Sequence, residues 1–180
     1  MSNPPTAARG RSPTSAIVGT AVFVALVPGT VVLVVPWWIR SAAGGAAGAS
    51  PGAWLRIAGA LLCAGGLAIF ADFVTRFVAE GHGTPAPVAP TRFLVRGGSY
   101  RFTRNPGYVG VVSMIAGQAL WFGSPATLVY AAVLAVGFHV FVLLYEEPTL
   151  RATYGADYEA YCRQVPRWLP RPSALLRRGA

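Results

Sequence analysis

The sequence predicts an all-α integral membrane protein with about four transmembrane helices and short interfacial helices after the last of them. Hydrophobic residues make up 54% of the 180 residues and charged residues only 12%, a balance that suits contact with lipid rather than water. Four apolar segments have about the length that a bilayer requires, and they cover residues 16–39, 52–78, 107–123 and 124–145. Most arginines lie on one side of these segments, as expected of a membrane topology.

The first segment follows a short arm, residues 1–15, that contains Arg9 and Arg11. This arrangement is similar to a signal peptide, but the apolar core is longer than the roughly 7 to 15 residues of a signal peptide. We therefore expect an uncleaved membrane anchor. With the second segment it forms an N-terminal pair of transmembrane helices within residues 16–78.

The second segment carries small residues and a charge pair on one face. Ala60, Ala64, Ala68 and Asp72 recur every four residues, a spacing that predicts a close contact between helices. Arg76 lies one turn beyond Asp72, so we expect an ion pair between them. An acidic residue in a membrane helix is a candidate for function, but this local partner favours a structural role.

The third and fourth segments are joined only by the residues around 123–125. So short a connection predicts an antiparallel hairpin. In the third segment, Gln118 is expected to donate a hydrogen bond to another helix. Residues 79–106, which precede the hairpin, are rich in Pro, Gly and Arg. They cannot form one continuous helix and are expected at the membrane surface.

After the hairpin, apolar and aromatic residues recur at helical spacing, at Leu150, Tyr154, Tyr158 and Tyr161. This pattern predicts short interfacial helices that Gly155 divides. Trp168 is expected at the level of the lipid head groups. Residues 79–172 are then the catalytic membrane core, and residues 173–180 are a basic tail.

All 15 cationic residues are arginines, and the net charge is +9. Only Arg40 and Arg56 lie on the opposite side of the predicted spans, so the positive-inside rule predicts a multi-pass protein of the cell membrane with both termini in the cytoplasm. The excess charge then serves topology and attraction to anionic lipids, and no nucleic-acid partner is expected. Cys63 and Cys162 lie in a span and in the tail, and they indicate neither a disulfide nor a metal site.

Two of the six acidic residues, Glu146 and Glu147, stand together at the end of the fourth segment. Pro148 disfavours helical geometry in the residue before it, so we expect the helix to end near this pair. Carboxylates at the negative end of a helix dipole are unfavourable, which indicates that a cation is held there. His139 lies about 10 Å further along the helix on nearly the same face. Neutralisation of the pair by surface arginines is the simpler alternative.

Arg104 stands just before the third segment, in the stretch RFTRNPGYVG. Because Pro106 suits the first turn of a helix, Arg104 is expected just outside the helix mouth. Its guanidinium can bind a carboxylate through two hydrogen bonds, although alone it would more simply anchor a lipid phosphate. Beside the acidic pair, it predicts a ligand that carries both an ammonium and a carboxylate.

Several motifs between Gly81 and Pro170 resemble those of the isoprenylcysteine carboxyl methyltransferase and phospholipid methyltransferase family of integral membrane enzymes. They are GTPAP, GGSYRFTRNPGYVG, the histidine upstream of the two glutamates, and YGADYEAYCRQVPRWLP. The resemblance implies a methyltransferase that uses S-adenosylmethionine and a lipophilic membrane-embedded acceptor. The acceptor would be a carboxylate, as in isoprenylcysteine methyl ester formation, or a phospholipid amine.

The resemblance also implies roles for individual residues. Arg104 and Glu147 are expected to be catalytic, and Glu146 and Glu147 to engage the amino-acid end of the donor. The implied donor-binding residues are Gly98, Tyr100, Arg104, Asn105, Pro106, Tyr108, His139, Glu146, Glu147 and Tyr158. Gly98 and Tyr100 match the turn on the adenosine side, and Tyr108 or Tyr158 offers an aromatic face for the sulfonium. Many family members have histidine where this chain has Asn105, and asparagine cannot act as a base.

Two other functions are compatible with the sequence. The stretch YGADYEAYCRQVP also resembles the tail of membrane sterol reductases, which bind a nicotinamide dinucleotide. The chain could instead be a small non-catalytic membrane subunit whose polar cluster only pins the hairpin. Four spans and the RNPGY turn favour methyl transfer. The acceptor, and which glutamate binds the ammonium, stay open.

Overall fold

The computed structural model describes residues 26–43, 51–81 and 94–170, and every regular element in these ranges is a helix. The all-α class is therefore confirmed for this part of the chain. In chain order the elements are η1 (Thr30–Val34), α2 (Val35–Ala42), α3 (Ala53–Gly81), η2 (Gly98–Arg101), α4 (Pro106–Phe122), α5 (Pro125–Phe141), η3 (Val142–Glu146), α6 (Glu147–Tyr154) and α7 (Ala156–Gln164). The predicted arm, the start of the first span and the basic tail lie outside the described residues.

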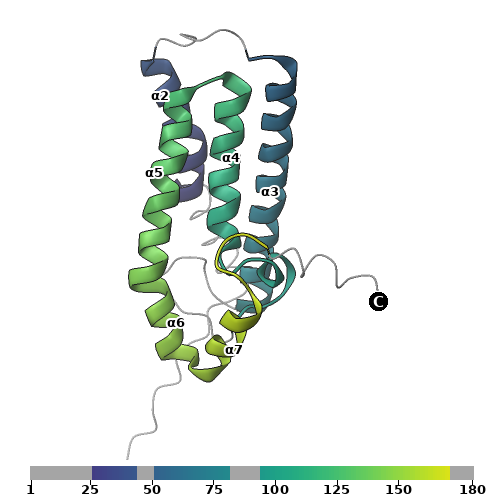
Figure 1. Ribbon diagram of the computed structural model, residues 1–180, viewed down its shortest axis with the longest axis vertical. Helices are drawn as coiled ribbons and strands as arrows, with labels where there is room; N and C mark the ends of the chain where they lie inside the picture. The colour runs from purple at the N-terminus through teal and green to yellow at the C-terminus, as the bar shows by residue number, and fades with distance from the viewer. Residues whose placement is uncertain (1–25, 44–50, 82–93, 171–180) are drawn as a thin grey trace, which may run out of the picture.

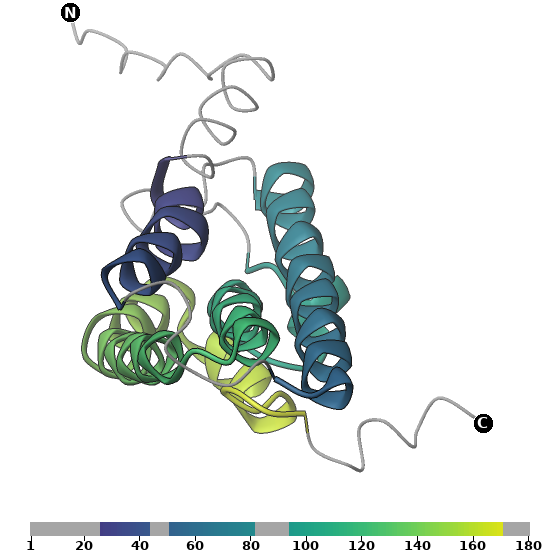
Figure 2. The ribbon, with the colours of Figure 1, turned by 90° about the horizontal axis from the view of Figure 1, so that it is seen from above.

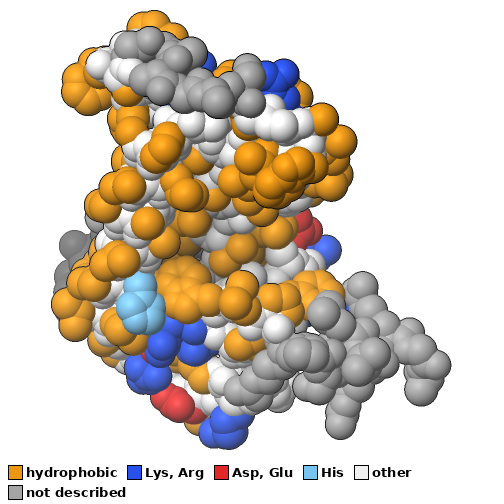
Figure 3. Space-filling model, turned by 45° about the horizontal axis from the view of Figure 1, so that its top comes forward, with side chains coloured by type: hydrophobic (Ala, Val, Ile, Leu, Met, Phe, Trp, Pro, Cys, Tyr) orange, Lys and Arg blue, Asp and Glu red, His pale blue; other side chains and the backbone are white. Residues whose placement is uncertain are grey.

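Helix α4 lies at the centre of the bundle, with α3 on one side and α2 and α5 on the other (Figures 1 and 2). Helix α6 continues α5 to the lower end of the bundle in Figure 1, and the short helix α7 turns back there. We call this end, formed by η2, α6, α7 and residues 165–170, the polar end. Figure 3 shows hydrophobic side chains over much of the bundle, a group of charged side chains toward its lower end, and a few others at its top and right edge.

Two helices of the described chain are long and apolar enough to cross a membrane, Ala53–Arg76 and Pro125–Tyr154. Their apolar side chains face outward; for example, Leu61 is 69% exposed and Val133 63% exposed. The other two predicted spans correspond to shorter helices, Leu26–Ala42 and the 17-residue α4. By length and composition, the structure thus accounts for two of the four spans that the sequence predicts.

Helices α3 and α4 touch through glycines. An added Cβ on Gly66 would lie 2.8 Å from the Gly110 carbonyl oxygen, and one on Gly117 would lie 2.7 Å from the Gly59 carbonyl oxygen. Such small residues allow the close backbone approach that membrane helices use for packing. The predicted seam of Ala60, Ala64 and Ala68 was wrong, because these alanines are exposed. The face of α3 that contacts α4 instead carries the neighbouring glycines, Gly59 and Gly66. Glycine permits a closer approach of the two backbones than alanine does.

Replacing Gly66 by alanine is expected to destabilise the bundle by roughly 1–3 kcal/mol, because the new methyl group overpacks the seam against backbone atoms. Gly65→Ala is the matched control, since a Cβ at Gly65 meets nothing within 4 Å. Thermal melting of the purified protein in detergent measures both variants. Equal melting temperatures for the two variants would contradict the seam.

The predicted hairpin of α4 and α5 is confirmed. Gly123 adopts a left-handed conformation, φ 63°, at the end of α4, and the Ser124 hydroxyl accepts a hydrogen bond from the Thr127 N–H at the start of α5. Gln118 donates to the Val32 carbonyl at 2.8 Å, as expected of an interhelical hydrogen bond. These contacts fix α4 between its neighbours and orient its first turn toward the polar end.

The expectation that the last long helix ends at Glu146 or Glu147 was wrong. The helix continues from α5 through the π-helical turn η3 into α6 and ends at Tyr154. In η3, the Glu147 N–H bonds to the Val142 carbonyl, five residues back. This wider turn places Pro148 in the first turn of α6, where its missing N–H and fixed φ are tolerated. The predicted break at Gly155, φ 49°, is confirmed.

Candidate active site

The loop before α4 is held by the segment that follows α7. The Arg104 N–H donates to the Pro166 carbonyl at 3.0 Å. The Thr103 hydroxyl and the Asn105 side-chain amide both donate to the Arg167 carbonyl, each at 3.0 Å. Pro106 then begins α4, as expected. Asn105, predicted as a donor-binding residue, thus uses its amide N–H to tie the loop to the C-terminal segment.

Glu147 lies at the centre of a cluster of arginines. It is 2% exposed, and its carboxylate accepts two hydrogen bonds from Arg167, at 2.6 and 3.1 Å. Arg104 and Arg151 approach the same carboxylate at 3.1 and 3.3 Å. A buried carboxylate needs such charge-assisted partners, because an unpaired one would be costly. Glu147 and Arg104 are brought together as predicted, but as partners of one another.

The Arg104 side chain is only 10% exposed, and one of its donors has no partner in the described part of the chain. One terminal nitrogen, Nη1, contacts Glu147 and also donates to the Cys162 sulfur at 2.8 Å. The Nε atom is buried and has no hydrogen-bond partner among the described residues. Unsatisfied buried donors are rare in folded proteins. This N–H is therefore a donor that is left over for the acceptor group of a ligand.

Glu146 differs from its neighbour, since no arginine in the described chain forms an ion pair with it. Its carboxylate accepts a hydrogen bond from the Tyr108 hydroxyl at 3.1 Å. The Tyr108 ring stacks on Phe138, with 4.5 Å between ring centroids, so α4 and α5 together fix its position. Glu146 and Tyr108 were both predicted at the site, and the structure brings them into contact. The two glutamates therefore have different electrostatic surroundings.

His139 is tied to the C-terminal segment. The Trp168 indole N–H donates to His139 Nδ1 at 3.0 Å, and the two rings lie 5.9 Å apart. The π-helical turn η3 follows His139 and ends at Glu146, so the even helical register that placed both on one face does not hold. Sequence reasoning missed Arg167 and Trp168 as residues of this region. Their signal was VPRWLP, an arginine and a tryptophan between prolines directly after the last helix.

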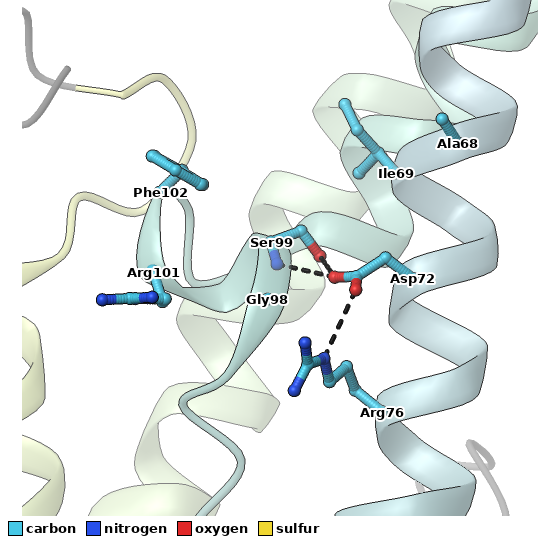
Figure 4. Close-up of a pocket in the computed structure, with 8 residues that line it drawn as sticks. All are labelled: Ala68, Ile69, Asp72, Arg76, Gly98, Ser99, Arg101 and Phe102. Atoms are coloured by element: carbon cyan, nitrogen blue, oxygen red, sulfur yellow. Dashed lines mark hydrogen bonds and ion pairs between the residues drawn. The ribbon is translucent and has the colours of Figure 1, made fainter. Parts of the chain in front are cut away.

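The turn η2, which begins at Gly98, contacts α3 through Asp72. Gly98 has φ 54°, and an added Cβ there would collide with the Asp72 carboxylate. The Ser99 N–H and hydroxyl both donate to Asp72 Oδ2 at 2.6 Å, and Arg76 Nε lies 3.3 Å from Oδ1. The predicted pair of Asp72 and Arg76 is confirmed. Figure 4 shows this arrangement beside a cavity of about 420 Å³, lined by Ala68, Ile69, Asp72, Arg76, Gly98, Ser99, Arg101 and Phe102.

Two predicted tyrosines lie inside the polar end. The Tyr100 carbonyl accepts a hydrogen bond from the Tyr161 hydroxyl at 2.7 Å, and burial raises the pKa of Tyr100. Tyr158 is 2% exposed and packs with Tyr161 and Val165. Burial also raises the pKa of Tyr158, so both hydroxyls stay protonated at neutral pH. With its ring enclosed, Tyr158 offers less access to a sulfonium than Tyr108 does.

The chain belongs to the phospholipid methyltransferase family, whose family model, described as "Phospholipid methyltransferase", matches residues 54–157. This range contains Arg104, Tyr108 and both glutamates. It ends before Arg167 and Trp168.

The curated relatives that match include two proteins from rice, Oryza sativa subsp. indica and Oryza sativa subsp. japonica. Each is named "Probable protein-S-isoprenylcysteine O-methyltransferase" and is 32% identical over 77 residues. The matched part covers 43% of this chain and 40% of each relative. No solved structure matches the chain.

Proposed function

We propose that this protein is an S-adenosylmethionine-dependent methyltransferase that acts on a lipophilic, membrane-embedded acceptor. Family membership supports the reaction class. The donor assignment rests on two groups next to the polar end that can each still bind a ligand group. These are the Glu146 carboxylate, which has no arginine partner in the described chain, and the buried Arg104 Nε–H, which has no hydrogen-bond partner there.

These groups fit the two ends of an α-amino acid. The Glu146 carboxylate would bind the ammonium of the donor, and the Arg104 Nε–H would bind its carboxylate. Glu147 holds Arg104 Nη1 at 3.1 Å, so it would position the guanidinium rather than bind the donor itself. The role proposed for the acidic pair is thus divided between its two members.

S-adenosylmethionine, when bound, supplies an electrophilic methyl group carried on a sulfonium. The protein has to hold the acceptor in line with that group and exclude water, an effect worth up to about 7–11 kcal/mol of the barrier when the alignment is good. One face of Tyr108 stacks on Phe138, and its other face would attract the sulfonium charge. Its hydroxyl keeps Glu146 oriented at 3.1 Å.

Asn105 bears on the choice of acceptor. Its amide is buried and bonded to the Arg167 carbonyl, and an amide cannot remove a proton. An amine acceptor must lose a proton, whereas a carboxylate acceptor is already deprotonated at neutral pH. The site therefore favours a lipophilic carboxylate over a phospholipid amine.

The arginine distribution supports a multi-pass orientation with the polar end and both termini in the cytoplasm,. In this orientation the helix Leu26–Ala42 and α4 complete four crossings. The donor would enter from the cytoplasm, and the acceptor laterally from the lipid.

Incubation of the detergent-solubilised protein with methyl-labelled S-adenosylmethionine and a host lipid extract tests the proposal. Label that mild base releases from the lipid as volatile methanol identifies a methyl ester, whereas label that stays non-volatile after the same treatment identifies an N-methylated amine. We expect base-labile label. Binding of a reduced nicotinamide dinucleotide without binding of S-adenosylmethionine would support a reductase instead.

A further inference from the structure

Residues 165–168, which we call the C-terminal strap, join three parts of the polar end. The strap carbonyls accept hydrogen bonds from residues 103–105. The Arg167 guanidinium binds Glu147, and the Trp168 indole binds His139. All of these contacts fall on residues within one or two helical turns of the groups proposed to bind the donor. The strap is therefore placed to set the distance between those groups.

One connection runs through Glu147. Arg167 donates two hydrogen bonds to this carboxylate, at 2.6 and 3.1 Å. The same carboxylate forms an ion pair with Arg104 at 3.1 Å. The bond to Glu147 also raises the pKa of Arg167, which stays charged. Because a bidentate pair fixes orientation as well as distance, a change at Arg167 is transmitted through one carboxylate to Arg104.

A second connection runs through His139. This residue lies in α5 shortly before the turn η3, which carries Glu146. The indole N–H of Trp168 bonds to its Nδ1 at 3.0 Å. The strap thus touches the helix that presents Glu146 and the cluster that holds Arg104.

We propose that Arg167 and Trp168 are positioning residues of the methyl-transfer site. They act through Glu147 and His139 and hold Arg104 and Glu146 at the separation that the amino-acid end of the donor requires. This inference rests on the proposed function, because it assumes that these two groups bind the donor. It adds to the site two residues that lie beyond the family match, which ends at residue 157.

Equilibrium binding of radiolabelled S-adenosylmethionine to the detergent-solubilised full chain tests the proposal. Arg167→Gln is expected to raise the Kd of the donor about tenfold or more, because it removes a charged partner of the buried Glu147 carboxylate,. Arg163→Gln is the matched control, because it removes the same charge from an exposed position on α7. Its Kd is expected to equal that of the wild type. Measurements are made below the melting temperature of every variant.

Two further variants separate positioning from stability. If Arg167 acts through Glu147, the effects of Arg167→Gln and Glu147→Gln on the Kd are not additive in the double variant. Trp168→Phe keeps an aromatic ring but removes the N–H, and it is expected to raise the Kd about two- to fivefold, the effect of one lost hydrogen bond. This variant carries the test if Arg167→Gln does not fold.

Donor affinities of Arg167→Gln and Trp168→Phe equal to that of Arg163→Gln, together with lower melting temperatures, would overturn the proposal and leave the strap a structural tie. Additive effects in the double variant would also overturn it, because the strap would then not act through Glu147. A wild type that does not bind S-adenosylmethionine would instead refute the proposed function.

Discussion

Glu146→Gln is expected to abolish most of the affinity for S-adenosylmethionine while leaving the protein folded. The substitution keeps the shape of the side chain and a hydrogen-bond acceptor for Tyr108, which donates to Glu146 at 3.1 Å. It removes the negative charge proposed to face the donor ammonium. Loss of one partner of a desolvated charge pair costs about 2–5 kcal/mol, or roughly 30-fold or more in Kd. Equilibrium binding of labelled donor measures the change.

Asp157→Asn is the control for this variant, since it removes one acidic charge from a side chain that is 83% exposed. Its donor affinity and melting temperature are expected to match the wild type. Tyr108→Phe should give an intermediate Kd, because it removes the hydroxyl that orients Glu146. Unchanged donor affinity in Glu146→Gln would refute the assignment of Glu146 as the ammonium site.

Glu147→Gln is expected to show the opposite pattern, with stability as the main loss. The neutral amide leaves Arg104, Arg151 and Arg167 without the buried carboxylate that they share. Breaking a buried ion pair in this way costs about 3–5 kcal/mol. For a chain of this size, the melting temperature should fall by roughly 10 °C, a shift that thermal melting in detergent resolves.

Donor affinity in Glu147→Gln should also fall, because Arg104 loses its anchor, but by less than in Glu146→Gln. Comparing the two variants therefore distinguishes the glutamate that holds Arg104 from the glutamate that binds the donor. Glu146→Gln should lower affinity strongly with little change in melting temperature, whereas Glu147→Gln should lower the melting temperature strongly and the affinity less. A wild-type melting temperature for Glu147→Gln would show that the arginine cluster does not depend on this carboxylate.

Features that depend on residues near one another in the chain could be predicted from the sequence. The hairpin follows from the short connection at Gly123 and Ser124, which the structure confirms with a left-handed glycine and a helix cap. The break at Gly155 and the i,i+4 pair of Asp72 and Arg76 are local in the same sense. The predicted contact between the Arg104 loop and the acidic pair follows from the antiparallel hairpin, which brings the two ends together.

Features that depend on helix rotation could not be predicted. The sequence pattern is compatible with a helix end at Pro148. In the structure a π-helical turn before this proline accommodates it, and the helix continues. The seam between α3 and α4 lies on Gly59 and Gly66 rather than on the alanines next to them. Both outcomes depend on how neighbouring helices pack, and a single repeating pattern does not report that packing.

The amino-acid sequence by itself determined the helical class, the apolar segments, the hairpin and the pairing of acidic and basic groups at one end of the bundle. Only the tertiary structure decided which glutamate is enclosed and which lacks an arginine partner within the described residues. Glu147 is enclosed because Arg104, 43 positions before it, and Arg167, 20 positions after it, converge on one carboxylate. Such a convergence is set by helix packing and by the strap across the polar end, so two identical neighbours in the sequence acquire different chemistry.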